Sequence, residues 1–166
     1  LFVRISLEFL IRELREQEYP LLRDFTYEAI FQRDETNLLP RSVLDDPQLR
    51  ACYEDFGRKD DFCLVAQVEG KIVGAVWTRV IAGAVKGFGN IDEKTPEFAI
   101  ALRKPCRGAG IGTALMRAML ALLREKGYPR ASLSVQKDNY AVRLYEKVGF
   151  RTVRETEEEF IMVCDL

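Results

Sequence analysis

The sequence contains no histidine, and this absence excludes several kinds of active site. Without an imidazole the chain cannot form a Ser-His-Asp triad or a Cys-His pair, and it cannot ligate zinc through histidine. It also has no imidazole to act as a general base near neutral pH. Any chemistry must therefore depend on other side chains or on the backbone.

Paired cysteines and long apolar stretches are missing as well. Cys52, Cys63, Cys106 and Cys164 lie far apart and form no CxxC pair, so the sequence indicates no metal site and no redox motif. We expect four ordinary thiols in a reducing cytosol, and hence a cytoplasmic protein. No apolar stretch reaches the ~20 residues that span a bilayer, and residues 1–9 lack an A-x-A cleavage site. Neither a membrane partner nor a secretory signal is expected.

The chain also lacks an excess of positive charge. It has 25 Lys and Arg against 26 Asp and Glu, so no nucleic-acid partner is expected. With 166 residues, 48% of them apolar, the composition is that of one globular domain with a core of its own. We assign this domain to residues 7–166 and treat residues 1–6 as an N-terminal extension that can originate from an expression vector.

Hydrophobic periodicity predicts a mixed α/β (α+β) fold. Strands are expected within 7–13 and at 62–68, 71–80, 98–102, 131–135, 150–154 and 160–164. Helices are expected at 20–31, 49–56, 111–126 and 140–148. The segments 32–42 and 82–90 are expected to be loops, the second one mobile because of its glycines. The whole is a mostly antiparallel twisted sheet of about seven strands flanked by about four helices.

A glycine cluster, residues 107–113 (RGAGIGT), lies between a predicted strand and the clearest predicted helix. Glycines allow close approach of the backbone to a ligand, and a helix start offers free N–H groups and the positive end of the dipole. With Arg107 beside them, these groups suit a pyrophosphate. No Lys follows as in a P-loop, and the spacing is not that of a Rossmann fingerprint. Both nucleotide interpretations are therefore weakened, and a merely tight turn remains the structural alternative.

Two motifs resemble the GCN5-related N-acetyltransferase (GNAT) superfamily. Arg107, Gly110 and Gly112 match its R-x-x-G-x-G acetyl-CoA loop, and residues 139–150 (NYAVRLYEKVGF) are similar to its N-x-x-A-x-x-L-Y-x-K-x-G-F signature. The motifs stand in the family's order, separated by a predicted helix and strand. The resemblance extends from about residue 7 to the C-terminus.

The resemblance implies a role for individual residues. The main chain around the glycine cluster would hold the pyrophosphate, and the end of the preceding strand would pair with the pantetheine arm. Tyr145 would donate a proton to the departing thiolate, as a phenol that is protonated at neutral pH can. No metal is implied. The implied cofactor-binding residues are Leu102, Arg103, Arg107, Gly108, Ala109, Gly110, Ile111, Gly112, Thr113 and Asn139.

Some of these residues also have a purely structural interpretation. Asn139 opens a predicted helix, where asparagine is a preferred cap. Tyr145 shares a helical stripe with apolar residues and could be a core residue. Cys106 beside Arg107 could be a nucleophile with a lowered pKa, but no histidine is available as its base.

Glu97 is the predicted general base, because the family resemblance implies a glutamate on this strand. Alternation places Glu97 on the same strand face as Ala99 and Ala101, beside small residues. An exposed acid at a strand start is the alternative. Asp92 and Glu93 are further candidates that the sequence does not rank.

The resulting hypothesis is an acetyl-CoA-dependent N-acetyltransferase that acts on a small-molecule or peptide primary amine in a ternary complex. A non-catalytic acyl-CoA-binding sensor is the alternative. The acceptor would be selected by 32–42, the second helix and 82–90, and the acidic run 155–159 favours neutral or positively charged amines. The identity of the acceptor, the acyl chain length and the choice between monomer and homodimer remain open.

Overall fold

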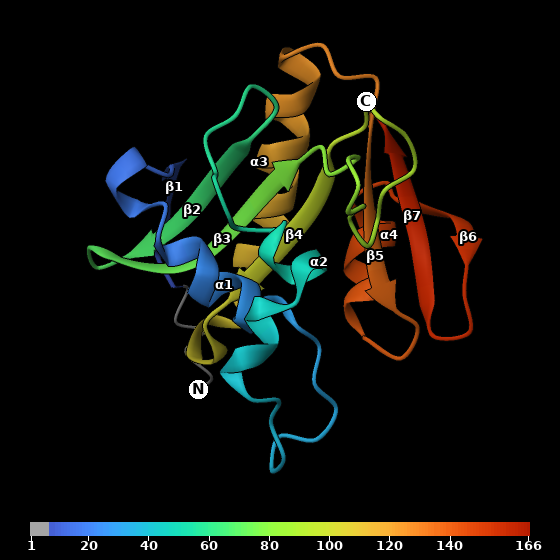
Figure 1. Cartoon of the computed structure of the whole chain (residues 1–166). Helices are drawn as coiled ribbons and strands as arrows, with labels where there is room; N and C mark the ends of the chain where they lie inside the picture. Colours follow the sequence, from blue (N-terminus) through green and yellow to red (C-terminus); the bar gives the residue numbers. More distant parts are fainter. Residues whose placement is uncertain (1–6) are drawn as a thin grey trace.

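The computed structural model describes residues 7–166; the extension 1–6 lies outside the described residues. A seven-stranded sheet runs in the order β1-β2-β3-β4-β5-β7-β6 (Figure 1). Every pairing is antiparallel except that of β4 with β5. The strands are β1 Leu10–Glu13, β2 Phe62–Val68, β3 Lys71–Arg79, β4 Glu97–Leu102, β5 Arg130–Gln136, β6 Arg151–Glu155 and β7 Glu159–Asp165. The predicted fold class is confirmed, with strand ends within one or two residues for β2 to β7.

Four α-helices accompany the sheet: α1 Leu21–Ala29, α2 Pro47–Arg50, α3 Ile111–Glu125 and α4 Ala141–Lys147. Short 3₁₀ turns lie at Glu16–Glu18, Arg41–Asp45 and Lys104–Cys106. The helix predicted at 49–56 is wrong in extent. Asp46 caps α2 through the amide of Gln48, with Pro47 in the first turn. Beyond Arg50 the chain forms turns, and the main-chain carbonyls there bond a side chain of the sheet, described below.

Strand alternation builds two cores, one on each face of the sheet. On β2, Leu64 packs into the cluster beneath α3 and α4, whereas the next residue, Val65, packs into the cluster beneath α1. Figure 1 shows α1 and α2 in front of the sheet and α3 behind it. The two faces therefore present different sets of helices to the middle of the sheet.

The sheet opens between β4 and β5. Their parallel pairing consists of one register pair, Glu97 with Ser132, supported by the amide of Ser132 bonding the carbonyl of Pro96 at 3.0 Å. Beyond this point the strands diverge, so the main-chain groups on that edge of β4 lose their neighbour. A parallel pair that separates leaves a gap in the centre of the molecule, and the candidate site lies there.

Across residues 7–166 no helix combines the length and the apolar character that spanning a bilayer requires.

Candidate active site

The gap between the diverging strands holds a cavity of about 290 Å³. Residues from β4 and β5 form its facing sides, and α1, β3, α4 and β7 contribute further parts of the wall. Leu39, Leu49 and Phe88 bring in the three segments predicted to select an acceptor: 32–42, the region of the second helix and 82–90. The site is thus assembled from segments that are distant in sequence.

Glu97 is one of the residues that line this cavity. Its Oε2 accepts a hydrogen bond from the amide of Gly89 at 2.9 Å, whereas its Oε1 is buried and bonds nothing in the described chain. Burial raises the pKa of this carboxyl to about 7, and the bond from Gly89 opposes the rise only in part. A buried carboxylate with a free oxygen and a pKa near neutrality has the properties of a general base.

Two of the three glycines of 82–90, Gly87 and Gly89, serve close packing rather than mobility. A Cβ on Gly87 would lie 1.6 Å from Oε1 of Glu97, and one on Gly89 would lie 2.8 Å from the backbone of Leu133. The hydroxyl of Ser132 also donates to the carbonyl of Gly89 at 2.7 Å. The expectation of a mobile segment is therefore wrong for its second half, which is bonded to β5 and covers Glu97.

Tyr145 lies on α4, with its ring edge against Phe150 and its side chain on the cavity wall. It is 9% exposed, and its hydroxyl donates to no acceptor within residues 7–166. Burial raises the pKa of this phenol to about 12, so it keeps its proton at neutral pH. The core interpretation and the active-site interpretation of Tyr145 are therefore compatible. Its ring packs in the core, and the same side chain lines the cavity.

The glycine cluster forms an exposed turn that leads into α3. Gly108 and Gly110 have φ values of +78° and +82°, which an L side chain adopts with strain. None of the six amides from Gly108 to Thr113 donates a hydrogen bond to another described residue. A loop of free amides at the start of a 15-residue helix fits a diphosphate group.

The end of β4 supplies the free strand edge next to this loop. The amide of Arg103 bonds the carbonyl of Val73 at 2.8 Å, so Arg103 faces β3. By alternation Leu102 faces the gap, and its carbonyl accepts from Nε of Arg107 at 3.2 Å. The amide of Arg103 is therefore already engaged by β3, whereas Leu102 has the orientation that pairing with a pantetheine arm requires.

Two further candidates receive structural assignments. Oδ1 of Asn139 accepts from the amide of Ala141 at 2.9 Å, so its side chain pairs the first amide of α4 from one residue before the N-cap, which is Tyr140, and Asn139 lines the cavity as well. Cys106 ends a 3₁₀ turn and is not part of the cavity wall. Its placement gives no support to a nucleophilic role.

The alternative bases are distributed away from the cavity. Asp92 accepts hydrogen bonds from the amides of Lys94 and Thr95 and from Arg130, and these bonds hold the pKa of its carboxyl well below its usual range. Glu93 is exposed in the same turn. Neither residue lines the cavity, so Glu97 is the one candidate of the three that does.

Residues 11–150 match the family model described as "Acetyltransferase (GNAT) family". The chain belongs to the GNAT family. A mycothiol acetyltransferase of Saccharomonospora viridis is 35% identical over 124 residues, which are 72% of this chain and 39% of the relative. An N-alpha-acetyltransferase of Sulfurisphaera tokodaii is 30% identical over 113 residues, 61% of this chain and 68% of the relative. The chain spans about two fifths of the length of this mycothiol acetyltransferase and of the one from Streptomyces avermitilis.

Solved structures agree on the GNAT fold. The PaiA N-acetyltransferase of Thermoplasma acidophilum, solved with coenzyme A, superposes with a TM-score of 0.69 at 18% identity and covers 96% of this chain and 99% of its own. An acetyltransferase structure from Acinetobacter baylyi reaches 0.71 at 16% identity, covering 98% and 95%. The overall fold of this GNAT chain is thus shared with them over most of its length.

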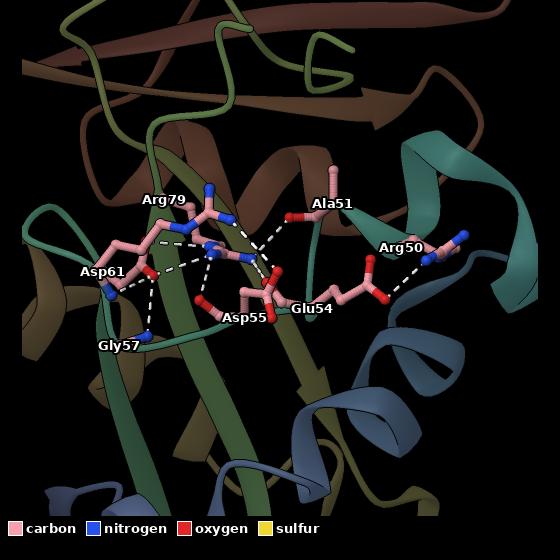
Figure 2. A network of polar contacts seen from close by, with 8 residues as sticks. Arg50, Ala51, Glu54, Asp55, Gly57, Asp61 and Arg79 are labelled. Atoms are coloured by element: carbon pink, nitrogen blue, oxygen red, sulfur yellow. Dashed lines mark hydrogen bonds and ion pairs between the residues drawn. The ribbon is translucent and has the colours of Figure 1, made fainter. Parts of the chain in front are cut away.

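Sequence reasoning missed one cluster of this GNAT site, an ion pair whose Arg79 lines the cavity. Figure 2 shows the guanidinium of Arg79, at the end of β3, between both oxygens of Asp61 (3.0 Å each) and the main-chain carbonyls of Ala51, Glu54 and Asp55. The side chains of Arg79 and Asp61 are 5% and 4% exposed. The pair ties the turns after α2 to the sheet. No local sequence pattern predicts this ion pair, because Arg79, Asp61 and the carbonyls are brought together only by folding.

A second unpredicted contact links the loop after α1 to the end of β5. Arg33 pairs with both carboxylate oxygens of Asp138 and donates to Gln136 at 3.1 Å. Gln136 in turn donates to Glu159 at 3.1 Å, and both Gln136 and Glu159 line the cavity. This chain of polar contacts joins the segment after α1 to β5 and β7.

Proposed function

We propose that this domain transfers an acetyl group from acetyl-CoA directly to a primary amine, without a covalent enzyme intermediate. The observation that carries the proposal is the cavity that contains both a buried carboxylate with a free oxygen and a protonated phenol. Membership of the GNAT family and the names of its acetyltransferase relatives support the same reaction class.

The amides from Gly108 to Thr113 would hold the pyrophosphate, with Arg107 as the neighbouring cation. The edge of β4 at Leu102 would orient the arm that follows, and Asn139 would contact it from the opposite side of the gap. Such positioning converts an encounter into an intramolecular reaction, which is a large part of what an enzyme can contribute.

Acetyl-CoA supplies an activated acyl group, and the reaction forms an N–C bond as the C–S bond breaks. Glu97 accepts the proton that the amine must lose, and its raised pKa makes it a stronger base than an exposed carboxylate. Tyr145 donates its O–H to the sulfur as negative charge develops there, and it regains a proton from solvent. Amides facing the gap stabilise the negative oxygen of the acyl group.

The test is acetyl-CoA-dependent thiol release measured over a panel of primary amines, together with thermal shifts in acetyl-CoA, NAD and ATP. A ligand present at 100 times its Kd adds ~2.7 kcal/mol of stability, so the preferred nucleotide is identified without turnover. We expect kcat to rise with pH through about 7, the pKa of Glu97, and this limb to be lost in Glu97→Gln. Glu93→Gln, in the exposed turn nearby, is the matched control.

Binding of acetyl-CoA without thiol release on any amine would favour the non-catalytic acyl-CoA sensor. A thermal shift with NAD or ATP, and none with acetyl-CoA, would contradict the proposal entirely. A pH limb that survives in Glu97→Gln would assign the base to another group.

A further inference from the structure

The side of the cavity opposite α3 has an apolar wall. Aromatic rings from three separate segments, Phe31, Trp77 and Phe88, line it, and aliphatic side chains of Leu39, Val43 and Leu49 fill the spaces between them. The indole N–H of Trp77 donates to the carbonyl of Cys52 at 2.9 Å, so its polar atom is already paired. Burial raises the pKa of the Cys52 thiol to about 12, which keeps this lining residue uncharged.

Arg79 is the one cation among the described residues of this wall, and it has no donor left to offer. A guanidinium carries five N–H groups. Two bond Asp61, two bond the carbonyls of Ala51 and Glu54, and the fifth bonds the carbonyl of Asp55 at 3.3 Å (Figure 2). Its charge is compensated by a carboxylate that is itself buried. An anionic ligand would therefore find no cation to pair with.

The charges that remain in the wall are negative. Glu97 has its free Oε1, and Glu159 stands at the β7 side with one oxygen engaged by Gln136. A carboxylate carried next to the acceptor's amine would lie against aromatic rings or near Glu97. Burying an anion without a partner is strongly unfavourable, and a like charge nearby adds to the cost.

We propose, on the basis of the function proposed above, that the acceptor is a small amine with an apolar body and no anionic group beside the nitrogen. The volume, about 290 Å³, lies at the lower end of ligand sites and must also receive the acetyl end of the cofactor. The apolar wall binds the body, and Glu97 receives the amine. Free α-amino acids are excluded by their carboxylate, and polyamines are disfavoured because they have no compact apolar body to fill this wall.

The experiment compares acceptors that differ only in the carboxylate: 2-phenylethylamine with L-phenylalanine, and isoamylamine with L-leucine. We expect kcat/KM to be at least about 100-fold higher for each amine than for its amino acid, which corresponds to ~2.7 kcal/mol. L-Phenylalaninamide keeps the bulk of the carboxylate without its charge, and we expect it to stay within about tenfold of 2-phenylethylamine. Spermidine represents polar polyamines.

A substitution in the apolar wall tests whether the lack of a free cation is what disfavours acceptors with a carboxylate. Val43→Arg introduces a free cation, and we expect it to shift the ratio of L-phenylalanine to 2-phenylethylamine by about tenfold toward the amino acid. Val153→Arg introduces the same charge on the exposed strand β6 outside this cavity and should leave the ratio unchanged. Because the readout is a ratio, a general loss of activity does not affect it.

Each outcome separates the two proposals. If acetyl-CoA gives no thermal shift and no amine is acetylated, the proposed function fails and the acceptor class with it. If acetyl-CoA binds but L-phenylalanine or spermidine equals or exceeds 2-phenylethylamine, the acceptor class alone is overturned. Preference for a dipeptide amide over every small amine would overturn it in favour of peptide N-termini.

Discussion

The two sides of the central gap offer different chemical groups to a ligand: main-chain groups on one side and side chains on the other. On the side of α3, the features suited to a ligand are main-chain groups: free amides at residues 108–113 and the open edge of β4 at Leu102. On the side of α1, the wall consists of side chains from segments spread between Thr26 and Ala99. The first side depends on backbone conformation, and the second on packing.

This difference determines which amino-acid substitutions each side of the gap can accept. Backbone recognition requires particular φ values, so it restricts a few contiguous positions to glycine. A packed wall accepts any set of apolar side chains that fills the space, so it restricts volume and polarity but not identity. We therefore expect changes to the two sides to separate cleanly in binding and kinetic measurements.

Tyr145 lies where the two sides meet, and its hydroxyl should show the largest effect. Tyr145→Phe removes a group needed only when charge appears on sulfur, so we expect kcat to fall by ~10²–10⁴-fold. Acetyl-CoA affinity should hardly change. The free energy of unfolding should hardly change either, because the hydroxyl bonds nothing in residues 7–166 and the ring keeps its contact with Phe150.

The control is Tyr140→Phe, which removes a hydroxyl from a residue that is 74% exposed just before the same helix. Full kcat in Tyr145→Phe at saturating acceptor would return this residue to a purely structural role.

The glycine loop tests the backbone side alone. Gly110→Val forces a β-branched residue into a φ of +82°, where the Cβ itself meets no neighbour, so the expected damage is to loop conformation. We expect the Kd for acetyl-CoA to rise by about 100-fold, the equivalent of losing two or three hydrogen bonds of ~1 kcal/mol each. Isothermal titration calorimetry on the folded variant measures this directly.

Gly127 provides the matched control at the other end of α3. It has a φ of +88° and equally open surroundings, so Gly127→Val carries similar strain without touching the loop. Both variants should lose similar stability, ~1–2 kcal/mol. Equal acetyl-CoA affinities in the two variants would contradict a pyrophosphate site at residues 108–113.

Sequence reasoning succeeded where the signal is local. Strand β2 was predicted at its observed bounds, and α3 to within one residue, because alternation, helical periodicity and the closing Gly127 all lie within the element. The glycine loop and Tyr145 were accessible for the same reason, since family motifs are contiguous. The predicted facing of Glu97 likewise followed from strand alternation.

Sequence reasoning failed where distant segments meet. Arg79 bonds carbonyls 24 to 28 residues away, which ends α2 early and makes the 49–56 prediction too long. Gly87 and Gly89 were interpreted as mobile, although their function is to leave room for Glu97 and the backbone of β5. Glycine in a sequence does not distinguish freedom from close approach, and only the fold shows which one applies.

The smallest expected effect concerns Glu97, a side chain of the packed wall. Its burial should make the free energy of unfolding depend on pH, which the backbone side of the gap does not do. Burial raises the pKa of Glu97 to about 7, above the ~4.3 of an exposed glutamate. Between these values the folded chain retains a proton that the unfolded chain has released. The free energy of unfolding therefore falls as pH rises through this window, and the loss is complete above about pH 7.

Glu97→Gln removes this titration while its amide oxygen can still accept from Gly89. We expect the variant to be more stable than the wild type by about 1–3 kcal/mol at pH 8, and the difference to vanish near pH 4.5. Urea unfolding at the two pH values measures it, with the exposed Glu93→Gln as control. A difference of the same size at both pH values would mean that Glu97 does not carry the buried charge of this cavity.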